Sequence, residues 1–242
     1  MARRLSELRP TDEFIRWVLA DEQPDVVLLE GDCIAWIGGA EMAGEVWVTA
    51  LGPDAATCAR LVEQLGAQQH IDGITVPEDA FALLPAALQS PDHGHWCFWV
   101  HDPALVPIGA SDAIDLSDDD QRIAALLEHS DSAHIFPGDE RIVRWVGVVE
   151  GDELISVAAQ RMEVTGAAHI VSVCTAPERR GEGLARRACT RIMKLADAEG
   201  APAIVLEMYV ANDSGRRTYE VLGFREVGRY RSGLLRGGSK PR

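Results

Sequence analysis

The stretch 169–223 constrains the fold of this chain more than any other part of the sequence. It begins with a strand-like run, His169–Thr175, and continues with a loop rich in arginine and glycine, Pro177–Gly183. A helix is predicted from Leu184 to about Glu199, because apolar residues recur there at helical spacing. A strand, a glycine loop and a helix in this order bring backbone amides and the positive end of a helix dipole to one point. The loop is therefore predicted to bind an anion, most simply a phosphate.

Two short motifs in this stretch occur together at a spacing known from one superfamily. The first is Arg-Gly-Glu-Gly-Leu-Ala at 180–185, which fits the pattern Gln/Arg-x-x-Gly-x-Gly/Ala. The second begins at Asn212, has Tyr219 seven residues later and ends in Gly-Phe at 223–224. Together they resemble the two signatures of the GNAT superfamily, the acyl-CoA-dependent N-acyltransferases. The resemblance implies that the glycine loop binds the pyrophosphate of acyl-CoA.

The order of the predicted elements in this half also occurs earlier in the chain. Strand 45–51, a helix that begins at Pro53, strand 71–76 and a helix ending at Leu88 parallel the elements that follow His169. Residue identity between the halves is slight, and the earlier copy lacks the arginine and glycines of the loop. We therefore expect an α/β fold with a mixed sheet, similar to the GNAT acyl-CoA N-acyltransferase fold, in two tandem copies.

A segment with two prolines and a glycine, 101–111, is the natural place for a linker between these copies. We predict a degenerate GNAT-like domain at 1–105, a linker at 106–112 and a catalytic GNAT domain at 113–242. The formal net charge is −15, with 17 acidic and 5 basic residues up to Leu105 but 21 acidic and 18 basic residues after it. This acidity argues against general nucleic-acid binding. It suggests a cationic acceptor, although acidity can equally serve solubility alone.

The sequence predicts no metal site, disulfide framework or membrane segment. The five cysteines are scattered and include no Cys-x-x-Cys pair, so we expect buried, reduced thiols. No run approaches the roughly 18 apolar residues of a transmembrane helix, and residues 1–10 lack the apolar core of a signal peptide. A cytoplasmic protein without a membrane or nucleic-acid partner is therefore expected, and its oligomeric state is left open.

The resemblance assigns acetyl-CoA, the acyl donor, to named positions. Its pyrophosphate would meet the glycine loop and the first turn of the helix, and its pantetheine arm would pair with the motif strand where this strand leaves its neighbour. Arg186 could add charge, whereas a solvated helix face is the simpler expectation for Arg187. The implied donor-binding residues are Val173, Cys174, Thr175, Arg180, Gly181, Gly183, Leu184, Ala185 and Asn212.

Three residues are candidates for the chemistry itself. Tyr219 matches the family tyrosine that hydrogen-bonds or protonates the CoA sulfur, and a packing tyrosine is the alternative. An amine with a pKa near 10.4 is almost fully protonated at pH 7, so a lysine-like acceptor needs a base. His169 lies eleven residues before Arg180, where some family members place a catalytic glutamate, and Glu207 on the next strand could act through a water. A structural role is the alternative for each.

These features together predict an N-acetyltransferase. It would transfer an acetyl group from acetyl-CoA to a primary amine of a small, cationic molecule by direct attack in a ternary complex, because no cysteine lies in an evident nucleophile constellation. Two alternatives stay open: a protein acetyltransferase that acts on lysine or N-terminal amines, and a non-catalytic acyl-CoA-binding sensor. A sensor has no need of a proton donor at sulfur, so Tyr219 argues against that alternative.

Overall fold

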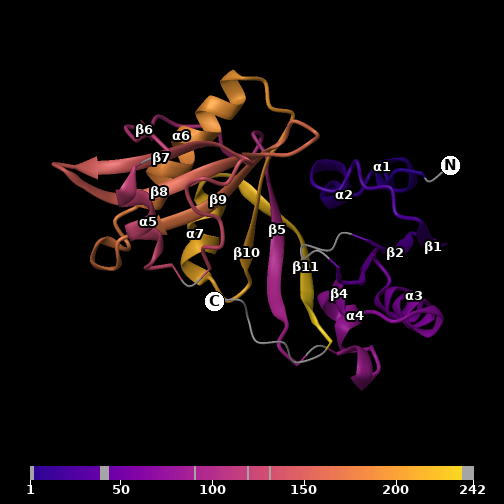
Figure 1. Ribbon diagram of the computed structural model, residues 1–242. Helices are drawn as coiled ribbons and strands as arrows, with labels where there is room; N and C mark the ends of the chain where they lie inside the picture. Colours follow the sequence, from indigo (N-terminus) through magenta and orange to yellow (C-terminus); the bar gives the residue numbers. More distant parts are fainter. Residues whose placement is uncertain (1–2, 39–43, 90, 119, 131, 236–242) are drawn as a thin grey trace. The chain divides into compact units, whose positions relative to one another are not determined.

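A computed structural model describes the chain except for residues 1–2, 39–43, 90, 119, 131 and 236–242 (Figure 1). The chain divides into two compact units. Unit 1 consists of residues 1–97, 209–211 and 228–242, and unit 2 of residues 98–208 and 212–227. Within the described residues, no helix is both long and apolar enough to cross a membrane.

Unit 1 contains a small mixed sheet with one long helix. Its elements are α1 (Leu5–Leu8), α2 (Glu13–Trp17), β1 (Val26–Glu30), β2 (Cys33–Ile37), β3 (Trp47–Leu51), α3 (Ala55–Gln68), β4 (Gly73–Pro77), α4 (Glu78–Phe81) and a 3-10 turn at Ala86–Leu88. The strands β1, β2 and β3 form an antiparallel meander, and β4 pairs parallel to β3. Residues 230–234 at the end of β11 (Phe224–Leu234) pair antiparallel with β4.

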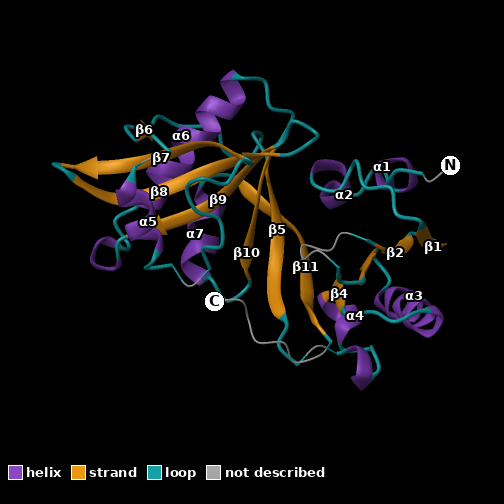
Figure 2. Ribbon diagram, viewed as in Figure 1, coloured by secondary structure: helices purple, strands orange, loops and turns teal. Residues whose placement is uncertain are grey.

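The core of unit 1 lies between α3 and strands β2, β3 and β4 (Figure 2). Helix α3 turns Leu61, Val62 and Leu65 toward the sheet, and all three are buried. Its N-terminus is capped by Asp54, whose carboxylate accepts a hydrogen bond from the Thr57 amide. The predicted helix from Glu78 to Leu88 is wrong in one respect: the helix ends at Phe81 and only a 3-10 turn follows. The intervening Pro85 has no N–H to donate within a helix, which accounts for the break.

Unit 2 contains a larger mixed sheet with helices on both faces. Its elements are β6 (Ile114–Leu116), α5 (Gln121–Leu127), β7 (Ile142–Glu150), β8 (Glu153–Met162), β9 (Ala168–Thr175), a 3-10 turn (Pro177–Arg179), α6 (Leu184–Ala198), β10 (Ile204–Tyr209) and α7 (Asp213–Val221). The strand order is β11-β5-β10-β9-β8-β7-β6, where β5 spans Gly94–His101. The pairs β6–β7, β7–β8 and β8–β9 are antiparallel, and β9–β10 is parallel.

Alternation along β7 places α5 and α6 on opposite faces of the unit 2 sheet. Trp145 belongs to the cluster that α5 covers, whereas Val148 packs with Leu184 of α6. These two strand residues are three positions apart and point to opposite faces.

The predicted helix from Leu184 is confirmed, since α6 runs from Leu184 to Ala198. Strand β6 was not anticipated, because its three residues are too short to show a period of two.

The two units share one local arrangement. In each, two parallel neighbouring strands are connected by a helix: β3-α3-β4 in unit 1 and β9-α6-β10 in unit 2. Each parallel ladder covers only three residue pairs. Strands β5 and β11 contribute residues to both units, as β5 is divided after Cys97 and β11 before Gly228. The tandem duplication and its domain boundaries stay a prediction, which this shared arrangement supports.

Candidate active site

The loop before α6 presents an open row of backbone amides. Gly181 and Gly183 have positive φ angles of 86° and 76°, a region that glycine enters without steric cost. A Cβ at Gly181 would meet no atom within 4 Å, so the space in front of the loop is open. The amides from Gly181 to Arg186 donate to no backbone carbonyl of the described residues. Open amides at a helix N-terminus form an anion-binding site.

The arginines around this loop have different partners. Arg179 is held by two carboxylates, with Glu150 at 3.0 Å and Glu182 at 2.8 Å. Arg180 donates to the carbonyls of Thr175 and His129, and these hydrogen bonds fix the loop. No carboxylate of the described residues forms an ion pair with Arg180, so its positive charge is available to a ligand. Because these contacts already order the loop, it loses less conformational entropy when it binds a ligand.

Further along α6, one arginine is neutralised and one is not. Arg187 forms a bidentate pair with Asp112, with a shortest distance of 2.5 Å. Arg186 makes no ion pair within the described part of the chain, and its guanidinium lies 3.6 Å from where a Cβ of Gly183 would be. A pocket of about 280 Å³ lies beside it, walled by the segment 106–110, by α6 and by the end of α7. Arg186 is thus available to an anion at the loop, whereas Arg187 is not.

Strand β9 leaves β10 directly before the loop. The parallel ladder pairs Ala168–Ile170 with Ile204–Leu206 and goes no further, although both strands continue. A bulge follows in β9, where the register with β8 shifts and Ser172 adopts a φ of 51°. The Ser172 hydroxyl donates to the Ile135 carbonyl at 2.8 Å, which holds the bulge in place. The backbone of 173–175 therefore has an edge that does not pair with β10, as an extended ligand arm requires.

The second motif forms the start of α7. Asn212 caps this helix, with its side-chain oxygen accepting from the Gly215 amide at 2.8 Å. A Cβ at Gly215 would lie 2.6 Å from the Asn212 side chain, so a larger residue at 215 would require the asparagine side chain to shift. Cys174 of the motif strand is buried and its thiol donates to the Leu126 carbonyl, which agrees with a packing role for this side chain.

Tyr219 lies in the second turn of α7 with its ring edge-on to Phe224, at 5.9 Å between ring centroids. It is 7% exposed, and its hydroxyl makes no hydrogen bond to any described residue. Burial, with a smaller contribution from the nearby Cys189 thiol, raises the pKa of Tyr219 well above that of a free phenol. Tyr219 therefore stays protonated across the physiological range and can donate a hydrogen bond.

The two predicted bases lie on one face of the sheet. His169 pairs in register with Val205 of β10, and Glu207 follows Val205 by two residues. Paired residues of parallel strands point to the same face, and so do residues two apart on one strand. His169 is 2% exposed and Glu207 is exposed. His169 is thus the more shielded of the two candidates.

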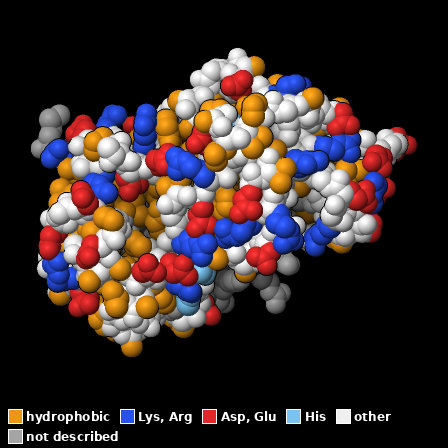
Figure 3. Space-filling model, turned by 180° about the vertical axis from the view of Figure 1, so that it is seen from behind, with side chains coloured by type: hydrophobic (Ala, Val, Ile, Leu, Met, Phe, Trp, Pro, Cys, Tyr) orange, Lys and Arg blue, Asp and Glu red, His pale blue; other side chains and the backbone are white. Residues whose placement is uncertain are grey.

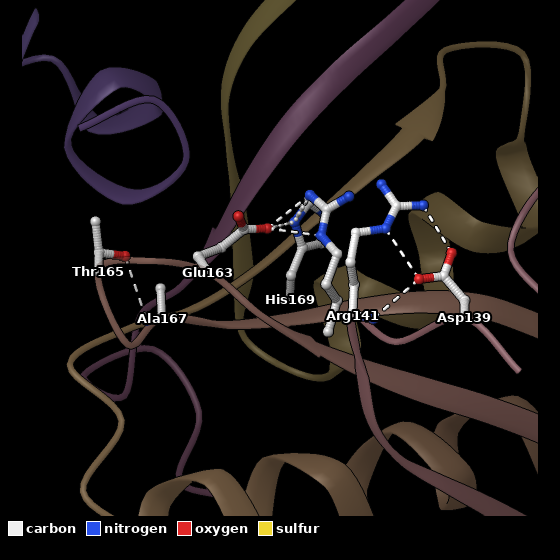
Figure 4. Close-up of polar contacts among 7 residues, drawn as sticks. Asp139, Arg141, Glu163, Thr165, Ala167 and His169 are labelled. Atoms are coloured by element: carbon white, nitrogen blue, oxygen red, sulfur yellow. Dashed lines mark hydrogen bonds and ion pairs between the residues drawn. The ribbon is translucent and has the colours of Figure 1, made fainter. Parts of the chain in front are cut away.

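His169 belongs to a buried charged cluster on the face that α5 covers. Its Nδ1 lies 2.6 Å from Oε1 of Glu163, and the Arg161 guanidinium lies 2.6 Å from the same oxygen. Figure 4 shows Glu163 and His169 directed toward each other, and beside them the Asp139–Arg141 pair, which comes from the segment before β7. Burial raises the pKa of Glu163, but the hydrogen bond from His169 and the charges of His169 and Arg161 outweigh it and lower that pKa overall. Glu163 is therefore a carboxylate.

The sequence model of the acetyltransferase (GNAT) family matches residues 97–224, more than half of the chain. The chain belongs to the GNAT acetyltransferase family. GNAT proteins are acyltransferases with acetyl-CoA as the donor, so this chain is an acyltransferase, and the sequence-based assignment to the family and fold is confirmed. No curated protein sequence matches the chain.

Solved structures of GNAT proteins share this fold along most of the chain. An acetyltransferase from Novosphingobium aromaticivorans is 22% identical, with 87% of this chain and 90% of that one covered and a TM-score of 0.55. A GCN5-related N-acetyltransferase from Kribbella flavida is 14% identical, covering 90% and 91%, with a TM-score of 0.53. An acetyltransferase from Colwellia psychrerythraea is 16% identical, covering 86% and 82%, with a TM-score of 0.55.

The predicted donor-binding residues of this GNAT chain all lie in unit 2. The loop at 180–185, the free edge at 173–175 and Asn212 all belong to that unit, as do Tyr219 and both candidate bases. Among the described residues, no three histidine, cysteine, aspartate or glutamate side chains come together as a metal site. Sequence reasoning missed Glu163. Its one signal was its place six residues before His169 across a Thr-Gly turn, which brings the two side by side in a hairpin.

Basic and acidic side chains are mixed over the face of the molecule seen in Figure 3. Ion pairs between unit 2 residues include Arg191 with Asp115 and Arg144 with Glu199. Mixed charge of this kind offers no extended basic surface on the face shown.

Proposed function

We propose that the chain transfers the acetyl group of acetyl-CoA to a primary amine of a small molecule, by direct attack in a ternary complex within unit 2. The observation that carries the proposal is the open row of amides from Gly181 to Arg186, next to the uncancelled charge of Arg180 and Arg186. Such a site fits the pyrophosphate of CoA, and the unpaired edge at 173–175 fits the amide-containing pantetheine arm. The pocket beside Arg186 leaves room for the adenosine end of the donor.

The chain's own residues can perform both proton tasks of the reaction. Acetyl-CoA supplies the acyl group as a thioester. Tyr219 donates a hydrogen bond to the sulfur as the carbon–sulfur bond breaks, and its raised pKa means that it stabilises the thiolate chiefly as a hydrogen-bond donor. His169 takes the proton that the amine loses as the new carbon–nitrogen bond forms, and Glu207 is the second candidate for this step.

The acceptor is proposed to be cationic, on the ground of the acidic residues that dominate the chain up to Leu105. Neutralising several of these acids should then raise the KM for a cationic amine and leave the KM for acetyl-CoA unchanged. An unchanged KM for the amine would contradict this choice of acceptor without touching the reaction itself.

The experiment that tests the proposed function is the release of free CoA thiol from acetyl-CoA over a panel of amines, beside calorimetric titration of CoA. The panel contains polyamines, aminoglycosides, small amino compounds, and peptides with free N-terminal or lysine amines. Turnover with a small amine supports the proposal, and turnover confined to peptides supports a protein acetyltransferase instead. Binding of CoA without turnover across the panel would contradict the proposed function and leave an acyl-CoA-binding sensor.

A further inference from the structure

We propose that Glu163 is a positioning residue that fixes the tautomer of His169, so that Nε2 of His169 is the proton acceptor in the reaction. The inference rests on the proposed function, because it assigns the atom that takes the amine proton. It concerns one hydrogen-bonded cluster, Arg161, Glu163 and His169, that lies entirely within unit 2.

The cluster is shielded and its contacts are short. Oε1 of Glu163 lies 2.6 Å from Nδ1 of His169, 2.6 Å from Nη2 of Arg161 and 2.9 Å from Nε of Arg161. The side chains of His169 and Glu163 are 2% and 10% exposed. A buried carboxylate needs compensating donors, and here one oxygen receives all of them.

Which groups around His169 can donate and which can only accept a hydrogen bond determines the position of the imidazole proton. Arg161 can only donate and Glu163 is a carboxylate that can only accept, so the contact between His169 and Glu163 requires a proton on Nδ1. Nη2 of Arg161 also lies 3.0 Å from Nδ1, because both donors aim at the same oxygen. A neutral imidazole with its proton on Nδ1 has its lone pair on Nε2. Nε2 of His169 makes no hydrogen bond to any described residue, and it is free to accept a proton.

Backbone hydrogen bonds fix the position of Glu163 at the end of β8. Glu163 follows β8 directly, its amide donates to the Ala167 carbonyl at 2.9 Å, and its carbonyl accepts from Gly166 at 2.8 Å. Arg161 pairs in register with His169 across the β8–β9 ladder. The hairpin thus places carboxylate, guanidinium and imidazole on one face, and the geometry does not depend on long side-chain rotamers alone.

The charged groups that face His169 lie on β8, on the turn after it and on β10. On β8 and the turn after it these are Arg161 and Glu163, and the Asp139–Arg141 pair lies beyond Arg161. On the β10 side the in-register neighbour is the apolar Val205, with Glu207 two residues on. The negative charge in contact with the ring is that of Glu163.

The proton balance is simple. The amine nitrogen bonds to the acetyl carbon, the carbon–sulfur bond breaks with its electron pair on sulfur, and the amine proton passes to Nε2 of His169. The Nδ1 proton stays between His169 and Glu163, and the imidazolium is neutralised by the carboxylate. The thiolate takes its proton from solvent after the hydrogen bond from Tyr219, and His169 returns its proton to solvent.

The test compares Glu163→Gln with Asp139→Asn in the full chain. The control removes a carboxylate from an arginine pair in the segment directly before β7 and does not touch the imidazole. In Glu163→Gln the ring loses the carboxylate that holds its proton on Nδ1, so kcat should fall about 10²-fold. The KM for acetyl-CoA should stay unchanged. Equal kcat values for wild type, Glu163→Gln and Asp139→Asn would overturn the inference.

A measurement without turnover separates this inference from the proposed function. Nitrogen-15 chemical shifts of the His169 ring in the wild type report the tautomer directly. A protonated Nδ1 and unprotonated Nε2 at pH 8, lost or mixed in Glu163→Gln but kept in Asp139→Asn, supports the inference even if no amine in the panel is acetylated. A proton on Nε2 in the wild type overturns it, whatever the enzyme assay gives.

Discussion

The carboxylate of Asp54 accepts a hydrogen bond from the amide of Thr57 at 2.7 Å, so the N-terminus of α3 already holds an anion. At the corresponding position of α6 lies Gly183, which offers no side chain and leaves the first-turn amides open. Two helices that follow parallel-sheet strands in the same order therefore differ at the one place where a phosphate would bind. In unit 1 the Asp54 carboxylate occupies the place where a phosphate would bind, and in unit 2 no side chain caps the N-terminus of α6.

One molecule of CoA should accordingly bind per chain. Calorimetric titration is expected to give a stoichiometry of one. Asp54→Ala removes the cap of α3 and should lower the free energy of unfolding by about 1 kcal/mol, without changing the affinity for CoA. A stoichiometry near two would show that unit 1 binds the donor as well.

The positive φ of Gly183 gives a second prediction. Gly183→Ala forces a side chain into the left-handed region, at a cost of about 1–2 kcal/mol, and adds a methyl group where the ligand would approach. We expect a lower melting temperature and a clearly weaker affinity for CoA by calorimetry. Gly151→Ala is the matched control, because Gly151 has a φ of 61° and a Cβ there would meet no atom within 4 Å, but it lies in the β7–β8 turn. Similar losses of CoA affinity in both variants would show that backbone strain, and not the position of Gly183 at the binding loop, causes the loss.

Arg186 and Arg187 are adjacent but should differ in their effect on donor binding. Arg186→Gln removes an uncancelled charge beside Gly183 and should weaken CoA binding about tenfold, which corresponds to ~1.4 kcal/mol. Arg187→Gln removes a charge already paired with Asp112 and should change the affinity by less than about twofold. Titration at two salt concentrations checks the reason, because only the wild type and Arg187→Gln should show the full salt dependence.

Tyr219→Phe should reduce turnover and leave donor binding intact. The hydroxyl has no partner among the described residues, so its removal should cost little stability. Loss of the hydrogen bond to sulfur should lower kcat by about 10–10²-fold, measured by thiol release with saturating substrates. Because burial raises the pKa of Tyr219, activity should show no loss from its ionisation up to at least about pH 10. An unchanged kcat in this variant would exclude the proposed role.

The cysteines should not interfere with a thiol assay. All five are buried, and burial raises the pKa of both Cys58 and Cys189 to about 12, so almost no thiolate forms at pH 8. We expect no rapid reaction of the native protein with a disulfide reagent, and five equivalents after unfolding in denaturant. Fast reaction of even one thiol before unfolding would contradict the burial.

How far the sequence reaches is clearest at α6 and at His169. The spacing of apolar residues predicted α6 to within one residue at its end, and two motifs predicted the family and the anion-binding loop. These features are local, since helical period, glycine conformation and helix dipole depend on neighbours within a few residues. The break after Phe81 was local too, and the proline that causes it was visible in the sequence.

The charged surroundings of His169 depended on the fold. The contact between Glu163 and the imidazole follows from the β8–β9 register, which pairs Arg161 with His169 next to the turn. Likewise, only the tertiary structure separates the cancelled charge of Arg187 from the available charge of Arg186, since Asp112 is 75 residues away in sequence. The sequence by itself determined which local elements form and where an anion can bind. The pairing of distant strands decided which side chains surround it, because hydrogen bonds and ion pairs act over a few ångströms and only folding brings such residues within that range.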